Sequence, residues 1–388
     1  YIIFLEVLKV QLVSKILIIN SSSPSDLVGG TQSSLNYVIE NLKEKNFKIS
    51  FISWSFNKDK VGFYQLKKFN GLRLPDIRKN ILSFHIFIFK NHSQIKQLFN
   101  VDIVWIHSPL PWFFITKFLN KNSKSIYTIH GPLKKELFFS NSKLKFLKLL
   151  ISNIILKKCV SEPNLIHCNS NYVYEESLSE SKFLVSKKKI ILELLLDNYL
   201  FHKNITNLPR LNNFDHLNFI ENNFFLLSRR LVKRTGVLEF IKLINQDRFF
   251  KDFLFIVTGD GPLKKEILKF VRDNVIYLGE IDETLVNFLK NKAFCYILPS
   301  IEAEGYSLLA KEAIVLNKFV IHTNQGGLKE SLNGYDKAKI FEINNIDSLK
   351  RIFNGLTNDL RKNLPIPSSN RYHKKEFINK LEILFNSL

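Results

Sequence analysis

The sequence predicts an α/β protein with two Rossmann-like, doubly wound domains that face each other across a cleft. Short apolar runs of strand length alternate with segments of helical spacing along most of the chain. The alternation occurs in two series, and an Asn-rich stretch at 200–220 separates them. A length of 388 residues also suits two domains. We therefore expect domains at 1–200 and 201–370 and a final helix at 371–388.

The first series opens with a βαβ pattern. Residues 15–20 form an apolar run that leads into a loop with Gly29 and Gly30. Apolar residues then recur at helical spacing over 33–45, and 49–54 is the next strand-like run. A strand, a glycine-containing turn, a helix and a strand in this order predict a parallel sheet.

Three further buried strands are expected at 102–107, 125–130 and 164–169. The first two end in His107 and His130. Ligand groups gather at the carboxyl ends of strands in open α/β sheets. Both histidines are therefore placed where function is expected, although a lone histidine at a strand end more often has a structural role.

The second series repeats this pattern. Its expected strands are 224–228, 253–258, 275–278, 294–298 and 319–322. Its expected helices are 237–244, 262–271, 283–289 and 307–316. Apolar spacing at 372–388 predicts the final helix.

The composition is strongly basic. Lys and Arg number 56 against 35 Asp and Glu, a net charge of +21, of which +14 falls in the first 200 residues. This balance favours an anionic partner, such as a phosphorylated ligand or an acidic membrane, although Lys-rich codon drift explains it equally well. A nucleic acid is not expected, because Arg is scarce and no nucleic-acid-binding motif is present.

The cysteines and the hydropathy pattern restrict the compartment. The three cysteines are too few and too scattered for a disulfide framework or a zinc site. No apolar run approaches the roughly 18 residues of a transmembrane helix. We therefore expect a cytoplasmic protein.

The most informative segment is 299–312, which holds two carboxylates eight residues apart, Glu304 and Glu312. Gly305 favours a loop around Glu304, with a helix that starts near Ser307 and carries Glu312 in its second turn. Free backbone amides at the start of a helix suit a phosphate, and carboxylates on either side suit sugar hydroxyls. A capped surface helix is an equally simple interpretation of the same residues.

An ordered set of motifs resembles the retaining GT-B glycosyltransferases of family 4 (group 1). Glu304 and Glu312 resemble the family's E-x7-E signature. The other matches, in chain order, are Gly29-Gly30, Asp102–His107 read as the pD-x-V-H strand, His130-Gly131, Ser170-Asn171, Arg230-Leu231 with Gly236, Gly259-Asp260-Gly261-Pro262, and Gly326-Gly327 with Glu330. They span about residues 14 to 335, most of the chain. The resemblance implies an N-terminal acceptor-binding and a C-terminal nucleotide-sugar-binding domain.

The resemblance also implies roles for individual residues. Arg230 would neutralise the donor diphosphate, a task that suits a forked guanidinium. The family's lysine partner falls on Thr235, so Lys233 or Arg234 would have to reach the phosphates instead. Arg229 stands where the family has glycine.

Further implied contacts complete the donor site. Glu312 would accept ribose hydroxyls and Glu304 a hydroxyl of the donor sugar. His130 would contact that sugar near the reacting carbon. The Gly29-Gly30 loop and the turn of Gly259, Asp260, Gly261 and Pro262 would approach the nucleotide. The backbone amides of Gly305, Tyr306, Ser307 and Leu308 would hold sugar and phosphate.

The segment 134–158 indicates a membrane partner. It holds seven lysines and one glutamate, with apolar residues on one helical face. A basic amphipathic helix of this kind is typical of contact with an anionic membrane surface. A domain helix with a lysine-rich exposed face fits the same pattern.

The sequence thus predicts a retaining hexosyltransferase. It would move a sugar from a nucleotide diphosphate donor, expected to be a UDP-sugar, to a glycan or lipid-linked acceptor in surface polysaccharide or lipopolysaccharide synthesis. No Asp-x-Asp pair occurs in the sequence, so we expect no metal and no cofactor besides the donor. A nucleotide-sugar epimerase of the same architecture and a non-catalytic donor-binding protein remain alternatives.

Overall fold

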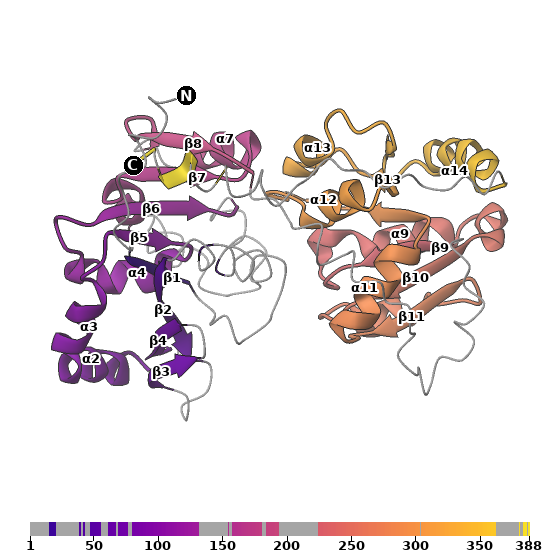
Figure 1. Ribbon diagram of the computed structural model, residues 1–388. Coiled ribbons are helices and arrows are strands. Elements are labelled where there is room, and N and C mark those ends of the chain that lie inside the picture. The colour runs from indigo at the N-terminus through magenta and orange to yellow at the C-terminus, as the bar shows by residue number, and fades with distance from the viewer. Residues whose placement is uncertain are drawn as a thin grey trace. The chain divides into compact units, whose positions relative to one another are not determined.

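The structure is a computed structural model, and it describes two units of the chain. The described residues are 15–20, 39, 42, 47–55, 61–66, 69–76, 80–131, 154, 157–180, 184–193, 224–302, 304–361, 380, 383–385 and 387–388. Unit 1 comprises Tyr1–Leu194 with Ile378–Leu388, and unit 2 comprises Leu195–Phe377. In Figure 1 each unit is a twisted sheet with helices packed on it, as the predicted α/β class requires.

Unit 1 contains an eight-stranded sheet in the order β3-β4-β2-β1-β5-β6-β7-β8. Its strands are β1 (Lys15–Ile19), β2 (Lys48–Ser55), β3 (Gly62–Leu66), β4 (Phe69–Pro75), β5 (Ile103–Ile106), β6 (Lys124–Ile129), β7 (Leu165–Cys168) and β8 (Lys189–Ile191). Its helices are α2 (Ile81–Lys90), α3 (His92–Leu98), α4 (Pro109–Ile115), the short 3-10 helix η2 (Thr116–Phe118) and α7 (Asn171–Glu180). All pairings are parallel except β3 with β4.

Unit 2 contains a six-stranded parallel sheet in the order β11-β10-β9-β12-β13-β14. Its strands are β9 (Phe224–Ser228), β10 (Leu254–Thr258), β11 (Val275–Gly279), β12 (Cys295–Leu298), β13 (Phe319–His322) and β14 (Ala338–Ile340). Its helices are η5 (Lys233–Thr235), α9 (Val237–Ile244), η6 (Arg248–Asp252), α10 (Lys264–Ile267), α11 (Glu283–Lys292), α12 (Leu308–Val315), α13 (Gly327–Ser331) and α14 (Ile346–Arg361).

The strand order places the functional edge of unit 2. Numbered along the chain, the strands run 3-2-1-4-5-6, which is the order of a dinucleotide-binding Rossmann sheet. The order reverses between β9 and β12, so a ligand is expected to bind beyond the carboxyl ends of these two strands. In unit 1 the same reversal lies between β1 and β5.

Both faces of the unit 2 sheet are covered. Successive residues of a strand point to opposite faces. Accordingly, Phe225 and Leu227 pack with α9 and α14, whereas Phe224 and Leu226 pack with α11, α12 and α13. All four side chains are buried, which explains why the strand is an uninterrupted apolar run.

Most predicted strands and helices are present, with two local differences. The predicted helix at 262–271 is a short α10, Lys264–Ile267, because Gly261 and Pro262 belong to the preceding turn. The hairpin of β3 and β4, the strands β8 and β14, and the helices α2, α3, α4, α7, α13 and α14 were not expected. The three cysteines are buried free thiols.

Several predictions fall on residues that the structure does not describe. Gly29 and Gly30 lie outside the described residues, and so do nearly all of 134–158 and most of the final helix at 371–388. Among the described residues, no helix is long and apolar enough to cross a membrane.

Candidate functional site

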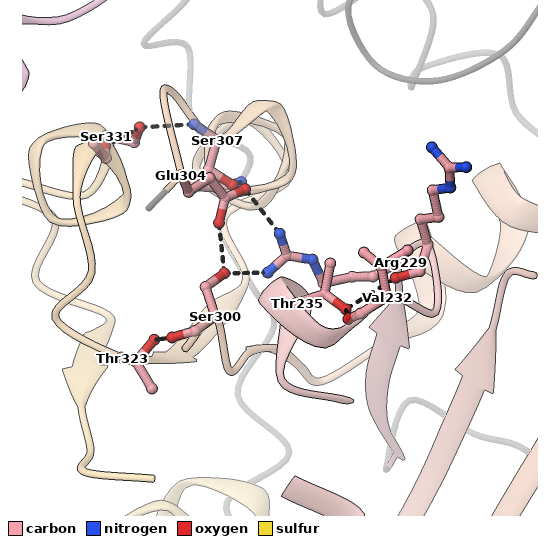
Figure 2. Close-up of polar contacts among 11 residues, drawn as sticks. Arg229, Val232, Thr235, Ser300, Glu304, Ser307, Thr323 and Ser331 are labelled. Atoms are coloured by element: carbon pink, nitrogen blue, oxygen red, sulfur yellow. Dashed lines mark hydrogen bonds and ion pairs between the residues drawn. The ribbon is translucent and has the colours of Figure 1, made fainter. Parts of the chain in front are cut away.

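At the point where the strand order reverses in unit 2, three side chains form a closed polar ring. Arg229 follows β9, and Ser300 and Glu304 follow β12. The Arg229 guanidinium donates through Nη2 to Glu304 Oε1 (2.8 Å) and through Nη1 to Ser300 Oγ (2.7 Å). The Ser300 hydroxyl in turn donates to Glu304 Oε2 (2.6 Å). Figure 2 shows the Glu304 carboxylate held from both sides by this ring.

The ring determines the charge state of Glu304. Burial alone would raise the pKa of this carboxyl, but the positive charge of Arg229 and the hydrogen bonds from Ser300 and Arg229 outweigh it. The pKa of Glu304 is therefore lowered below its ordinary value, and the side chain is an anion at neutral pH. The side chains of Arg229 and Glu304 are 8% and 17% exposed, so the pair is largely shielded from water.

The loop after β9 presents cations to solvent. Thr235 is buried, and its hydroxyl lies within hydrogen-bond distance of the carbonyl oxygens of Val232 (2.7 Å) and Arg230 (2.9 Å). Thr235 thus stabilises its own loop. Arg230 is exposed, and its side chain makes no hydrogen bond or ion pair with any residue that the structure describes. Lys233 and Arg234 are exposed as well, close enough to Glu302 to act on its charge.

The turn of Gly259, Asp260, Gly261 and Pro262 lies directly against this loop. The amide of Leu231 donates to the carbonyl oxygen of Asp260 (2.9 Å), and that of Arg229 donates to Thr258 (3.0 Å). Gly259 has a φ of +124°, and a Cβ there would lie 2.1 Å from the carbonyl oxygen of Arg229. Glycine is therefore required by the close approach of the two backbones.

The segment that carries Glu304 is fixed from its other side. Ser307 caps α12, its hydroxyl accepting from the amide of Ala310 (3.3 Å), and its own amide donates to Ser331 Oγ (3.1 Å). Gly327 donates its amide to the carbonyl oxygen of Glu304 (2.8 Å). These contacts, some of them visible in Figure 2, hold Gly305, Tyr306 and Leu308 in a defined loop and first helical turn.

Glu312 has a different partner from Glu304. It lies on α12, and its Oε2 is 2.7 Å from Nζ of Lys290 on α11, in the geometry of an ion pair and not of a well-directed hydrogen bond. The two side chains are 13% and 11% exposed. The two carboxylates predicted to flank one ligand therefore each have a cationic neighbour of their own.

Unit 1 carries three histidines at the ends of adjacent strands. His107 Nδ1 lies 3.0 Å from His130 Nε2, and the two rings stack with centroids 5.2 Å apart. His167 lies in β7. Its Nδ1 is 2.9 Å from Thr128 Oγ1, and its Nε2 is 2.8 Å from the carbonyl oxygen of Leu192.

Burial keeps these imidazoles neutral. It lowers the pKa of His130 to about 4, with repulsion from His167 as the smaller cause. Burial also lowers the pKa of His167 to about 4, although its hydrogen bond to Leu192 acts in the opposite direction. For His107, burial followed by repulsion from the other two rings holds the pKa well below the ordinary value. At neutral pH the cluster can therefore exchange hydrogen bonds without carrying charge.

Comparisons with known proteins match each of the two units to a glycosyltransferase family model. The family model described as glycosyl transferases group 1 matches residues 210–368, and the model of glycosyltransferase family 4 matches residues 28–190. The chain belongs to the group 1 glycosyltransferases. An uncharacterized glycosyltransferase of Methanocaldococcus jannaschii is 27% identical over 354 residues, covering 87% of this chain and 88% of that protein.

Solved structures show that this glycosyltransferase has the GT-B fold. Sucrose-phosphate synthase of Thermosynechococcus elongatus superposes with a TM-score of 0.73 at 14% identity, covering 96% of this chain and 98% of that one. HepE of Anabaena in complex with UDP-glucose superposes with a TM-score of 0.71 at 16% identity, covering 97% of this chain and 100% of that one. A glycosyltransferase of Rickettsia africae superposes with a TM-score of 0.63 at 21% identity, covering 89% of each chain.

The structure of the glycosyltransferase brings together only some of the residues that the sequence singled out. Arg230, the turn at Gly259 and the loop of Glu304 lie at neighbouring strand ends of unit 2. Backbone hydrogen bonds of Arg229 and Leu231 join the loop after β9 to the turn at Gly259, and the amide of Ile301 joins the segment after β12 to Arg234 (3.0 Å). His130 lies in unit 1 with His107. Among the described residues, no group of three or more His, Cys, Asp or Glu side chains is arranged to hold a metal ion.

Two partners of the glycosyltransferase's carboxylates were missed. Ser300 lies only four residues before Glu304, in the segment 299–312, but its residue type gave no sign of the contact. Lys290 lies just beyond the predicted helix at 283–289, although it belongs to α11, and it was given no role. Arg229 did carry a signal, since it replaces a family glycine, but its pairing with Glu304 required the three-dimensional structure.

Proposed function

We propose that this glycosyltransferase moves a sugar, with retention of anomeric configuration, from a nucleotide diphosphate donor to a glycan or lipid-linked acceptor. The observation that carries the proposal is an exposed arginine without a partner among the described residues, Arg230, on the loop after β9. The preceding residue of that loop, Arg229, binds the shielded carboxylate of Glu304 at the reversal of strand order. A UDP-sugar is the donor we favour, and the HepE structures with UDP-glucose and with UDP and glucose are consistent with it.

Arg230 is proposed to hold the donor diphosphate. A guanidinium is always charged and matches phosphate oxygens with two parallel hydrogen bonds. Lys233 and Arg234 add positive charge from the same loop, in place of the lysine that Thr235 replaces. Stabilising the charge that develops on the leaving diphosphate is the largest contribution such residues make to the rate.

Glu304 is proposed to accept a hydroxyl of the donor sugar. A carboxylate has about four lone-pair positions, and the ring with Arg229 and Ser300 uses one on each oxygen. Ser307 also donates to this carboxylate, and the position that is left can accept from a sugar. Because Arg229 keeps the group ionised and fixed in orientation, the hydrogen bond to the sugar would be charge-assisted and well directed. Glu312, beside Lys290, is the proposed acceptor for ribose hydroxyls.

His130 is proposed to act as a neutral partner of the sugar, and unit 1 to select the acceptor. A neutral imidazole can donate or accept without attracting the diphosphate away from Arg230. The proposed reaction uses no metal, since the sequence has no Asp-x-Asp pair and cations line the loop after β9.

The proposed setting is surface polysaccharide or lipopolysaccharide assembly at the inner face of the cytoplasmic membrane. The support for it is the basic segment 134–158, with seven lysines and one glutamate. Such a segment would bring the enzyme to a lipid-linked acceptor.

The test begins with the purified full chain and a thermal-shift panel of UDP-, GDP- and ADP-sugars, because a bound donor raises the melting temperature. Donor hydrolysis and transfer are then measured for the wild type, Glu304→Ala and Arg230→Ala. We expect each variant to lower kcat/KM by about 100-fold or more. The matched controls Glu266→Ala and Arg248→Ala change exposed side chains of the same kind and should leave kcat/KM unchanged.

The same experiment separates the alternatives. An epimerase would convert a UDP-sugar incubated alone into its isomer, which NMR detects directly. A donor-binding protein would show a thermal shift with no hydrolysis or transfer. Background turnover that is unchanged in both variants would contradict the site assignment, and inversion at the anomeric carbon of the product would contradict retention.

A further inference from the structure

The helix α2 exposes an apolar stripe on the surface of unit 1. Leu82, Ile86 and Phe89 are 67%, 45% and 85% exposed. They follow one another at intervals of four and three residues, which places them within about 60° on one side of the helix. On the opposite side, Phe84 and Ile88 are buried in the core. A surface helix that is apolar on both faces indicates that something covers its outer face.

The stripe has an apolar neighbour in the hairpin. Phe63 of β3 is 45% exposed and lies opposite Leu72 of β4. Residues that are directly opposite in a ladder share a face, and Leu72 belongs to the same core cluster as Phe84 and Ile88. Phe63 is therefore at the edge of the sheet face that α2 covers. Figure 1 shows α2 and β3 at the same end of unit 1, and α2 contacts β4 and α3.

The charges around this face have one sign. Residues 61–100 contain seven Lys or Arg and a single acidic residue, Asp76, which is buried. Neither α2 nor α3 contains a carboxylate, and Lys90 and Lys96 on them are exposed. Two copies of this face would bring like charges together, whereas an anionic surface would attract both. Charge complementarity thus favours an anionic partner that also accepts apolar side chains.

We propose that the face formed by Leu82, Ile86 and Phe89, with Phe63 at its edge, docks the protein on an anionic lipid bilayer. The apolar stripe enters the boundary between headgroups and acyl chains, while Lys90 and Lys96 meet lipid phosphates. The residues of this contact are not those of the segment 134–158. Only the role of this contact, which is to bring unit 1 to a lipid-linked acceptor, rests on the proposed function.

The test uses the full chain with vesicles of phosphatidylcholine alone or mixed with phosphatidylglycerol, without donor or acceptor. The wild type should co-sediment with the anionic vesicles, and more weakly at high salt. Replacing the stripe by Leu82→Ser, Ile86→Ser and Phe89→Ser together should lower the partition coefficient by about 30-fold or more. The control Leu268→Ser with Ile340→Ser removes apolar groups of similar exposure from unit 2 and should bind as the wild type does.

A single substitution tests the contact without removing it. The native tryptophans Trp54, Trp105 and Trp112 are buried, so a new exposed tryptophan dominates any change in emission. Phe89→Trp should shift its emission to shorter wavelength and be quenched by brominated lipid on anionic vesicles. Leu268→Trp should show neither effect.

Three results would overturn the inference. The triple variant could bind vesicles as well as the wild type does, or Phe89→Trp could bind without any change in emission. Alternatively, a dimeric wild type that becomes monomeric in the triple variant and binds no vesicles would assign the face to a second copy of the chain. Since binding is measured without substrates, a loss of transfer with vesicle binding intact would contradict only the proposed function.

Discussion

The side-chain clusters at the ends of the central strands are charged in unit 2 and neutral in unit 1. In unit 2, Arg229, Ser300 and Glu304 form a ring with full charges, in which the carboxylate stays ionised although it is shielded. In unit 1, His107, His130 and His167 form a cluster of neutral rings, because burial lowers their pKa and no anion among the described residues opposes it. Both clusters lie at carboxyl ends of strands in sheets with the same reversal of order.

Similar sheet topology therefore places side chains at strand ends but does not determine their charge. A buried group stays charged only where a partner of opposite charge lies beside it. Glu304 has Arg229, whereas each histidine has another histidine or a neutral hydroxyl. The edge of unit 2 is thus suited to hold charge, and that of unit 1 to exchange neutral hydrogen bonds.

The largest expected effect comes from breaking the charged ring. Arg229→Ala leaves the Glu304 carboxylate shielded and without its cation, so we expect the free energy of unfolding to fall by about 3 kcal/mol or more. Adding Glu304→Gln to this variant should recover much of the loss. Urea unfolding of the wild type, both single variants and the double variant measures the coupling. Additive effects of the two substitutions would contradict the ring.

The same pair gives a pH dependence of defined sign. The pKa of Glu304 is lower in the folded than in the unfolded chain, so the stabilisation is present above the unfolded value, about 4.3. It should be lost as the pH falls through the lower folded value. Arg229→Ala should remove this part of the acid dependence, which urea midpoints below about pH 4.3 would detect.

The backbone that carries Glu304 gives the next largest effect. A Cβ on Gly327 would lie 1.8 Å from the carbonyl oxygen of Gly305, so Gly327→Ala should lower the free energy of unfolding by about 2 kcal/mol and displace the carboxylate. The control Gly355→Ala lies in α14 with nothing within 4 Å. It should raise the free energy of unfolding by about 0.5–1 kcal/mol. Equal effects of the two variants would contradict the close packing of this loop.

Particular residues show how far the sequence alone could lead. The strand at 224–228 and the helix at 237–244 were predicted to the residue, since one is an unbroken apolar run and the other follows Gly236, whose φ is +68°. The helix α2 was missed because it is apolar on both faces and so lacks a helical period. The charged ring was missed because it joins residues more than 70 positions apart. Local patterns predict elements and loops, but not which side chains meet.

The histidine cluster predicts a separate pH window. His130 and His167 titrate near pH 4 in the folded chain and near 6.5 when unfolded, so the unfolded chain binds more protons between these values. The free energy of unfolding should therefore fall as the pH is lowered from about 6.5 to 4. His167→Gln should make this fall shallower, and imidazole NMR shifts should show no titration of His167 above pH 5. A normal titration near 6.5 would contradict the neutral cluster.

The smallest effects are expected at Lys233 and Arg234, one of which would replace the family lysine whose position Thr235 occupies. Lys233 and Arg234 are exposed, and solvent screens their attraction for a diphosphate, so Lys233→Met or Arg234→Met should raise the donor KM by only about 3- to 10-fold and leave kcat unchanged. Whichever variant has the larger effect identifies the substitute, and Lys251→Met, also exposed, is the control. If both variants match that control, Arg230 alone carries the diphosphate. The charged edge of unit 2 would then depend on two adjacent arginines with separate tasks, Arg229 for the carboxylate and Arg230 for the phosphate.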